Sequence, residues 1–253
     1  MMFELEKWKQ YVSKMDERLL FVTVSGAHAY GFPSPDSDVD LRGCHQLPTE
    51  SLVGLATPSE TIDRMSIEDG VEVDLVSHEL GKYLRLLVTN NGYILEQVFS
   101  PLVVTGAEFL AELRPIARRC VTRYHFFHYR GFFATQKKLL GQEDPKRVKT
   151  LLYAYRVLMT GIHLLETGDV EPNLLVLNER FGHSYIDELV QMKQVAEQVG
   201  GQDLDWEFHF NELGRLEAQM GEAFESSTLP EDRDRASVNK LLVRLRMDYL
   251  SAD

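Results

Sequence analysis

The spacing of apolar and polar positions changes about 100 residues into the chain. Before that point, short apolar runs rich in β-branched and aromatic residues, or alternating in polarity, predict strands at residues 19–26, 38–45 and 70–77. The charged N-terminal stretch predicts an amphipathic helix, and residues 47–66 predict a short helix capped at Thr49 followed by a loop. The first part of the chain is therefore expected to form a small sheet with helices.

Apolar residues recur at helical spacing first near residue 80 and then throughout the second part of the chain. Leu80, Leu84 and Leu87 form a stripe that predicts a helix capped by Ser77, and the residues that follow Gly106 repeat this pattern. Helices are predicted within 107–140, from Asp144-Pro145 to Gly168, and at 184–199, 210–224 and 236–250. We expect an α+β fold with a sheet domain at 1–105 and an all-helical domain at 106–253.

Composition narrows the class of protein. The chain is 44% hydrophobic and 26% charged, and no apolar run reaches the about 20 residues that span a bilayer. We therefore expect a cytoplasmic protein with no membrane partner. The net charge of -12 opposes general nucleic-acid binding, yet residues 113–156 contain eleven Arg and Lys against two acids. This segment predicts a site for a polyanion.

The stretch SGAHAYGFPSPDSDVDLRG, at residues 25–43, carries the clearest chemical pattern. Gly26 follows the first predicted strand and Gly31 comes five residues later, so the residues between them fit one helical turn. Backbone N–H groups at such a turn bind phosphate through hydrogen bonds and the helix dipole. The first half of the stretch therefore predicts a phosphate grip.

Two aspartates close the stretch. Asp38 and Asp40 are two residues apart on a predicted strand, so their carboxylates project to the same side. Adjacent anions favour a bound cation, and Mg²⁺ (or Mn²⁺) takes such oxygen ligands together with substrate phosphates. Asp74 on a later strand is the expected third ligand, with Glu72 as the alternative on the same face. The sequence predicts a metal site for nucleotidyl or phosphoryl transfer.

These residues resemble the DNA polymerase beta nucleotidyltransferase superfamily. Within it, the stretch looks most like the RNA repair pathway DNA polymerase beta family, and the similarity extends through residues 84–104 and into 149–166. The resemblance implies metals held by Asp38, Asp40 and Asp74 and a nucleotide bound by the loop around Gly26. The predicted nucleotide-binding residues in this stretch are Ser25, Gly26, Ala27, His28, Gly31 and Ser37.

The chain departs from the family pattern at two positions. Ala27 stands where the pattern has serine, and His28 stands where it has arginine. A predicted helix face with Lys149, Tyr153 and Arg156 supplies further candidates, because two cations around one aromatic ring suit a triphosphate and a base. The metal ligands are intact, whereas the phosphate grip lacks one usual hydroxyl.

We expect an enzyme that transfers a nucleoside monophosphate from an NTP to a hydroxyl acceptor, with RNA as the first candidate acceptor. A protein acceptor, as for an AMPylating enzyme of antitoxin type, suits the negative net charge. A catalytically inactive nucleotide sensor or scaffold would follow from Ala27. The sequence leaves the base, the acceptor and the oligomeric state open.

Overall fold

The computed structural model describes residues 4–56, 58–195 and 204–250. Its contacts group these residues into two compact units. The first, here called the sheet unit, contains the described residues up to 25, residues 38–120 and the described residues from 232 onward. The second, the helical unit, contains residues 26–37 and the described residues within 121–231. The predicted domain boundary at residue 105 stays a prediction. The two units are not separated at a single point of the sequence, because each contains segments that lie apart along the chain.

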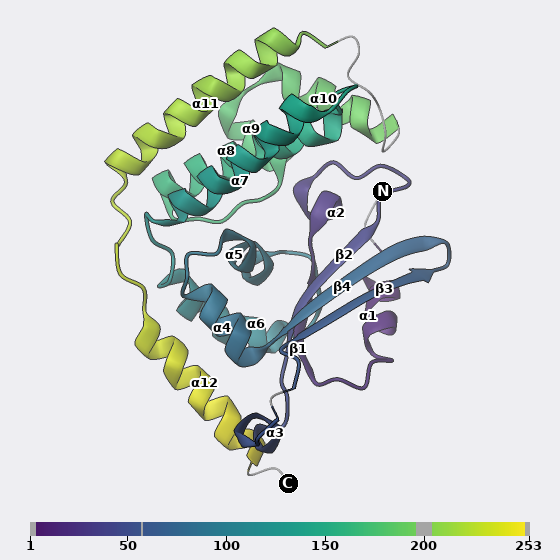
Figure 1. Cartoon of the computed structure of the whole chain (residues 1–253), viewed down its shortest axis with the longest axis vertical. Helices are drawn as coiled ribbons and strands as arrows, with labels where there is room; N and C mark the ends of the chain where they lie inside the picture. Colours follow the sequence, from purple (N-terminus) through teal and green to yellow (C-terminus); the bar gives the residue numbers. More distant parts are fainter. Residues whose placement is uncertain (1–3, 57, 196–203, 251–253) are drawn as a thin grey trace. The chain divides into compact units, whose positions relative to one another are not determined.

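The sheet unit is built on five strands in the order β3-β4-β2-β1-β5 (Figure 1). The parallel neighbours are β2 and β4, and the other neighbouring pairs are antiparallel. The strands are β1 (Leu19–Val24), β2 (Val39–His45), β3 (Thr61–Glu68), β4 (Val71–Glu79) and β5 (Val103–Thr105). The parallel pairing matters most for function, because it brings residues of two distant sequence segments level with each other.

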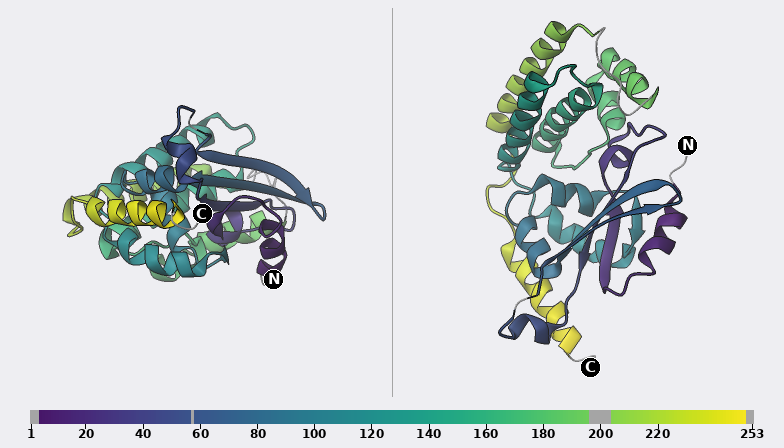
Figure 2. Two further views of the ribbon diagram at one scale, coloured as in Figure 1. Left: turned by 90° about the horizontal axis from the view of Figure 1, so that it is seen from below. Right: turned by 45° about the vertical axis from the view of Figure 1, so that its right-hand side comes forward.

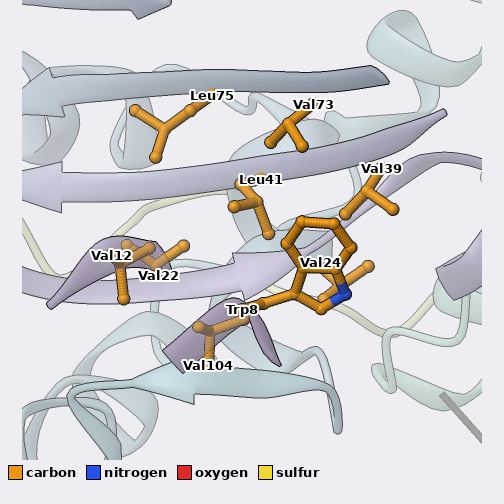
Figure 3. Packing of buried hydrophobic residues seen from close by; sticks show 9 residues of the cluster. All are labelled: Trp8, Val12, Val22, Val24, Val39, Leu41, Val73, Leu75 and Val104. Carbon is orange, nitrogen blue, oxygen red and sulfur yellow. The ribbon is translucent and has the colours of Figure 1, made fainter. Parts of the chain in front are cut away.

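One face of the sheet carries a core against the N-terminal helix. Trp8 and Val12 of α1 (Leu5–Val12) pack on alternate residues of the central strands, as Figure 3 shows. The strand residues in this cluster are Val22, Val24, Val39, Leu41, Val73, Leu75 and Val104. Since side chains alternate along a strand, the residues between these point to the opposite face.

Six helices of the sheet unit surround the strands. They are α1 (Leu5–Val12), α3 (Thr49–Val53), α4 (Leu80–Leu87), α5 (Gly92–Phe99), α6 (Ala107–Arg118) and α12 (Arg235–Leu250). The last of these returns to the sheet unit and contacts α3 and α4. Gln46 and Thr49 donate hydrogen bonds to backbone carbonyls of α12 at 2.9 and 3.0 Å, which fixes this helix beside the end of β2.

The helical unit is organised around one central helix. Its elements are α2 (Gly26–Tyr30), α7 (His125–Gln142), α8 (Val148–Thr167), α9 (Leu174–Phe181), α10 (Ser184–Val195) and α11 (Trp206–Ser226). Fifteen of the twenty residues of α8 are buried, because α7, α9, α10 and α11 all pack against it. Figure 2 shows α7, α8 and α11 side by side. Within the described ranges of the chain, we find no helix with the length and apolar character needed to cross a membrane.

The predicted strands are confirmed as β1, β2 and β4, but the predicted loop after residue 53 is wrong. Residues 61–68 form β3, which pairs with β4 in a long hairpin. Both faces of β3 are at least partly exposed, so its residues lack the alternation that marks a half-buried strand. The helical structure expected within 107–140 is confirmed and consists of α6 and α7.

Several predicted helix ends need correction. Ser77 lies inside β4, and Glu79 caps α4 instead by accepting a hydrogen bond from the Gly81 N–H at 2.6 Å. No side-chain cap bond precedes α3, whose first residue is Thr49. The start predicted at Asp144-Pro145 falls at Val148, whereas the predicted end at Gly168 is confirmed. Residues 196–199 of the predicted 184–199 helix lie outside the described residues.

Candidate functional site

Two of the predicted metal ligands lie directly opposite each other. In the parallel pairing of β2 and β4, Asp40 is the register partner of Asp74. Their neighbours Leu41 and Leu75 belong to the core on one face, so both carboxylates project to the other face. The side chains of Asp40 and Asp74 are 18% and 31% exposed, which leaves the pair open to a ligand from solvent.

Arg42 joins the two carboxylates. Its Nη2 donates to Asp40 Oδ1 at 2.6 Å and to Asp74 Oδ2 at 2.8 Å. Its Nη1 donates to the backbone carbonyls of Leu41 and Asp74 at 3.0 and 2.7 Å. No motif in the sequence singles out Arg42, although it is two positions after Asp40 and therefore shares its face. The geometry shows that the carboxylate pair binds a cation.

The third predicted ligand is less closely engaged. Asp38 is half-buried, immediately precedes β2 and makes no hydrogen bond or ion pair with any described residue. Glu72, the alternative, is exposed. Among the described residues, we find no group of three or more His, Cys, Asp or Glu arranged to hold a metal ion. The structure thus brings together Asp40 and Asp74. Asp38 is related to this pair only by its position two residues before Asp40.

The donor set fits a divalent ion. Mg²⁺ prefers carboxylate oxygens and commonly uses one or two of them, with water and substrate phosphates completing its octahedron. Asp40 and Asp74 each contribute one such oxygen, and both oxygens contact the same cation, the guanidinium of Arg42. These two residues would therefore hold Mg²⁺ or Mn²⁺.

Ser25 lies beside the same strand. Its backbone N–H donates to the carbonyl oxygen of Asp40 at 2.8 Å, which extends the β1–β2 pairing by one residue. The first residue of the motif is therefore fixed against the backbone of a metal-ligand candidate. Gly26 follows it with φ +61°, a conformation that favours glycine, and begins α2.

Within the helical unit, the end of α2 requires a second glycine. Gly31 has φ +89°, and a Cβ atom on it would lie 2.3 Å from Oδ1 of Asn173. The Asn173 side chain cannot yield easily, because it caps α9 by accepting from the N–H groups of Leu175 and Val176. The requirement for glycine at position 31 thus follows from packing as well as from φ, and its predicted role in nucleotide binding stays a prediction. Ala27 is buried and His28 half-buried in the turn between the glycines.

Two predicted nucleotide-binding residues of α8 pack against α2. The Arg156 guanidinium lies 3.8 Å from the ring centroid of Tyr30, and Tyr153 meets Tyr30 edge-on at 5.7 Å between centroids. Arg156 is fully buried, whereas Lys149 and Tyr153 are half-buried. The helix face that is predicted to bind a triphosphate and a base therefore packs on the α2 segment through Arg156 and Tyr153.

A buried lysine binds the loop that leads into β2. Lys193 of α10 is 1% exposed, and its Nζ donates to Ser34 Oγ at 2.6 Å and to Ser37 Oγ at 3.1 Å. Ser37 was predicted from the motif, but Lys193 is 156 residues further along the chain and no local pattern marks it. Ser37 thus accepts a hydrogen bond from Lys193, a partner that the local sequence does not indicate.

The basic residues of 113–156 are divided between the two units. Three of them are neutralised by carboxylates, in the ion pairs Arg119–Asp234, Lys137–Glu217 and Arg147–Glu143. Arg130 and Lys138 of α7 are exposed and form no ion pair with a described residue. Local charge in the sequence therefore overstates the positive charge available to one ligand.

Comparison with known proteins identifies the family. The family model described as the RNA repair pathway DNA polymerase beta family matches residues 3–244. The chain belongs to this family. Membership confirms the resemblance expected from the motif, and the family indicates a nucleotidyltransferase. The nucleotide, the acceptor and the metal belong to the proposal below.

Individual relatives were also found. The uncharacterized protein MJ0002 of Methanocaldococcus jannaschii is 35% identical over 154 residues, which cover 59% of this chain and 61% of that protein. The uncharacterized protein YcgL of Bacillus subtilis is 24% identical over 250 residues, or 94% of each chain. A crystal structure of a nucleotidyltransferase-like protein from Exiguobacterium sibiricum aligns with 87% of this chain and 72% of its own, with 14% identity and a TM-score of 0.31.

Proposed function

We propose that this protein is a metal-dependent nucleotidyltransferase that transfers a nucleoside monophosphate from an NTP to a hydroxyl group of RNA. The observation that carries the proposal is the convergence of the Asp40 and Asp74 carboxylates on one cation, at 2.6 and 2.8 Å. Two carboxylates that lie opposite each other on neighbouring strands repel each other. This repulsion destabilises the ionised pair unless a positive charge lies between them. A divalent ion with bound phosphates supplies that charge in this class of reaction.

Asp40 and Asp74 are the proposed ligands of Mg²⁺ or Mn²⁺, with Asp38 as the third. A divalent ion held there would supply the positive charge that lowers the pKa of an acceptor hydroxyl and offsets the charge of the leaving pyrophosphate. Asp74 is the proposed acceptor of the hydroxyl proton, because its second oxygen is not used by Arg42 and its side chain is 31% exposed. Asp38 has no competing ion pair with the described residues, so its carboxylate is available for the same role as a ligand.

The proposed nucleotide-binding residues are Ser25, Gly26, Ala27, His28, Gly31 and Ser37. Because Ala27 has no hydroxyl, backbone N–H groups of the turn and the Ser25 hydroxyl are the proposed phosphate donors. Lys149 is half-buried and is proposed to contact phosphate, whereas the packing of Tyr153 and Arg156 supports a role in holding the α2 segment.

RNA is the proposed acceptor because the family description names an RNA repair pathway. The exposed Arg130 and Lys138 supply charge that suits a phosphate backbone. The net charge of -12 favours a protein acceptor instead, as expected for an AMPylating enzyme. The two acceptors are distinguished by the molecule that becomes labelled.

The test is to incubate the full chain with each α-labelled NTP, Mg²⁺ or Mn²⁺, and RNA, tRNA or protein acceptors. Label on RNA or tRNA supports the proposal, and label on protein alone replaces RNA with a protein acceptor. Asp40→Asn and Asp74→Asn should each abolish transfer, whereas Asp63→Asn, which changes an exposed acid on β3, should not. Transfer that survives both active-site changes contradicts the proposal. Nucleotide binding by calorimetry without any transfer supports the inactive sensor, which Ala27 favours.

A further inference from the structure

We propose that Arg42 is an internal competitor of the metal ion: its guanidinium occupies the Asp40–Asp74 pair in the metal-free protein and must leave before a divalent cation binds. The inference rests on the assignment of this pair as the metal site in the proposed function. It adds that competition from Arg42 raises the metal concentration that is needed to fill the site.

The competition follows from shared oxygens. Nη2 of Arg42 lies 2.6 Å from Oδ1 of Asp40 and 2.8 Å from Oδ2 of Asp74, between the two acids. A divalent ion at carboxylate distances of about 2.1 Å would need the same space and would repel the guanidinium strongly. The two cations therefore exclude each other from this pair.

Arg42 is also placed so that it can leave. Its four hydrogen bonds, two to the carboxylates and two to the backbone carbonyls of Leu41 and Asp74, are all made by the guanidinium, so they are released together when this group moves. Its side chain is 21% exposed and flexible, so the guanidinium head can turn toward water while its stem stays on the sheet. An exchange between guanidinium and metal requires only a side-chain movement, with β2 and β4 unchanged.

The same contacts explain why an arginine is useful in the absence of metal. Asp40 and Asp74 are register partners on adjacent strands, and without a cation their negative charges would repel at close range. Arg42 offsets this repulsion and keeps the two side chains converged. Its removal should therefore have two opposite effects, a less stable metal-free protein and tighter binding of metal.

The experiment measures Mn²⁺ binding to the full chain by electron paramagnetic resonance, without nucleotide. We expect Arg42→Gln to bind Mn²⁺ about tenfold more tightly than the unchanged protein, which corresponds to about 1.4 kcal/mol. The melting temperature of Arg42→Gln should be lower without Mn²⁺ and should rise more on its addition. Arg64→Gln, which changes an arginine of β3 that pairs with Glu17, is the matched control and should leave Mn²⁺ affinity unchanged.

The outcomes separate this inference from the proposed function. Mn²⁺ binding that is lost in Asp40→Asn but equal or weaker in Arg42→Gln overturns the competition and leaves the metal site standing. Mn²⁺ binding that is indifferent to Asp40→Asn overturns the metal site, and the inference with it. Should Arg42→Gln fail to fold, Arg42→Lys provides the same test, because a single ammonium lacks the fork that reaches both acids and the backbone.

Discussion

The guanidinium of Arg156 stacks on the ring of Tyr30 at 3.8 Å and thereby joins the central helix α8 to the short helix α2. Arg156 has no exposed surface, and its guanidinium lies over the aromatic rings of Tyr30, Phe132 and Tyr153, which stabilise its charge in place of water. The residue therefore determines how the segment that begins the nucleotidyltransferase motif is held within the helical unit.

A double-mutant cycle measures this contact. Arg156→Met and Tyr30→Leu should show a coupling free energy of about 0.5–2 kcal/mol in urea unfolding, as expected for a desolvated cation–π pair. Arg130→Met with Phe126→Leu is the matched control, because that exposed arginine lies 5.8 Å from its ring. The control pair should couple by less than about 0.5 kcal/mol. Equal coupling in the two cycles would contradict the account.

Gly31 should tolerate no side chain. Gly31→Ala combines a left-handed φ of +89° with a Cβ atom 2.3 Å from Asn173, so we expect a loss of at least about 2 kcal/mol in the free energy of unfolding. Gly131→Ala is the control, because this helical glycine is exposed and has open space around it. That change should stabilise the protein by about 0.5–1 kcal/mol. Similar effects at the two glycines would rule out the steric explanation.

Lys193 should order the loop before β2. Lys193→Met removes the hydrogen bonds to Ser34 and Ser37, and we expect the backbone amide of Ser37 to exchange with deuterium about tenfold faster. Global stability should change less, because burial of an ammonium group carries its own cost. The exposed Lys138→Met change should leave this amide unaffected. An unchanged exchange rate at Ser37 in Lys193→Met would show that the lysine does not hold the loop.

His128 should make stability depend on pH. Burial and the nearby positive charge of Arg156 lower the pKa of His128 from 6.5 to about 4, so the unfolded chain gains a proton in this range that the folded chain does not. The contribution is complete above pH 6.5 and is lost as the pH falls toward 4, by about 2 kcal/mol at pH 5. His128→Gln should therefore lose about 2 kcal/mol less than the unchanged protein between pH 7 and pH 5 in urea unfolding. An equal loss in the free energy of unfolding between pH 7 and pH 5, in His128→Gln and in the unchanged protein, would contradict this prediction.

The pattern of the chain predicted those elements that have one buried face. Strand β1 is a buried apolar run, and β2 and β4 alternate with the core, so their patterns are readable in the sequence. The motif predicts Asp38 and Asp40 on one face, whereas the structure pairs Asp40 with Asp74. Strand β3 has no fully buried residue, so its sequence carries no such signal. The alternation that links Asp38 and Asp40 also places Arg42 on that face, but strand spacing does not indicate that one guanidinium contacts both Asp40 and Asp74.

Other parts of the site depend on contacts that local sequence does not encode. Helix α8 was interpreted as amphipathic, whereas neighbours on several sides bury its polar face along with its apolar one. Arg156 is therefore an interior residue despite its charge. Lys193 joins Ser37 across 156 residues, and only the folded helical unit brings them together.

The central claim is that Asp40 and Asp74 form a divalent-metal site for nucleotidyl transfer. The most direct test is the binding of Mn²⁺ in the presence of a non-hydrolysable NTP, followed by electron paramagnetic resonance. We predict binding by the unchanged protein and by Asp63→Asn, and a loss of at least about tenfold in affinity for each of Asp40→Asn and Asp74→Asn, since each removes one ligand charge. Equal Mn²⁺ affinity in all four proteins would contradict the account.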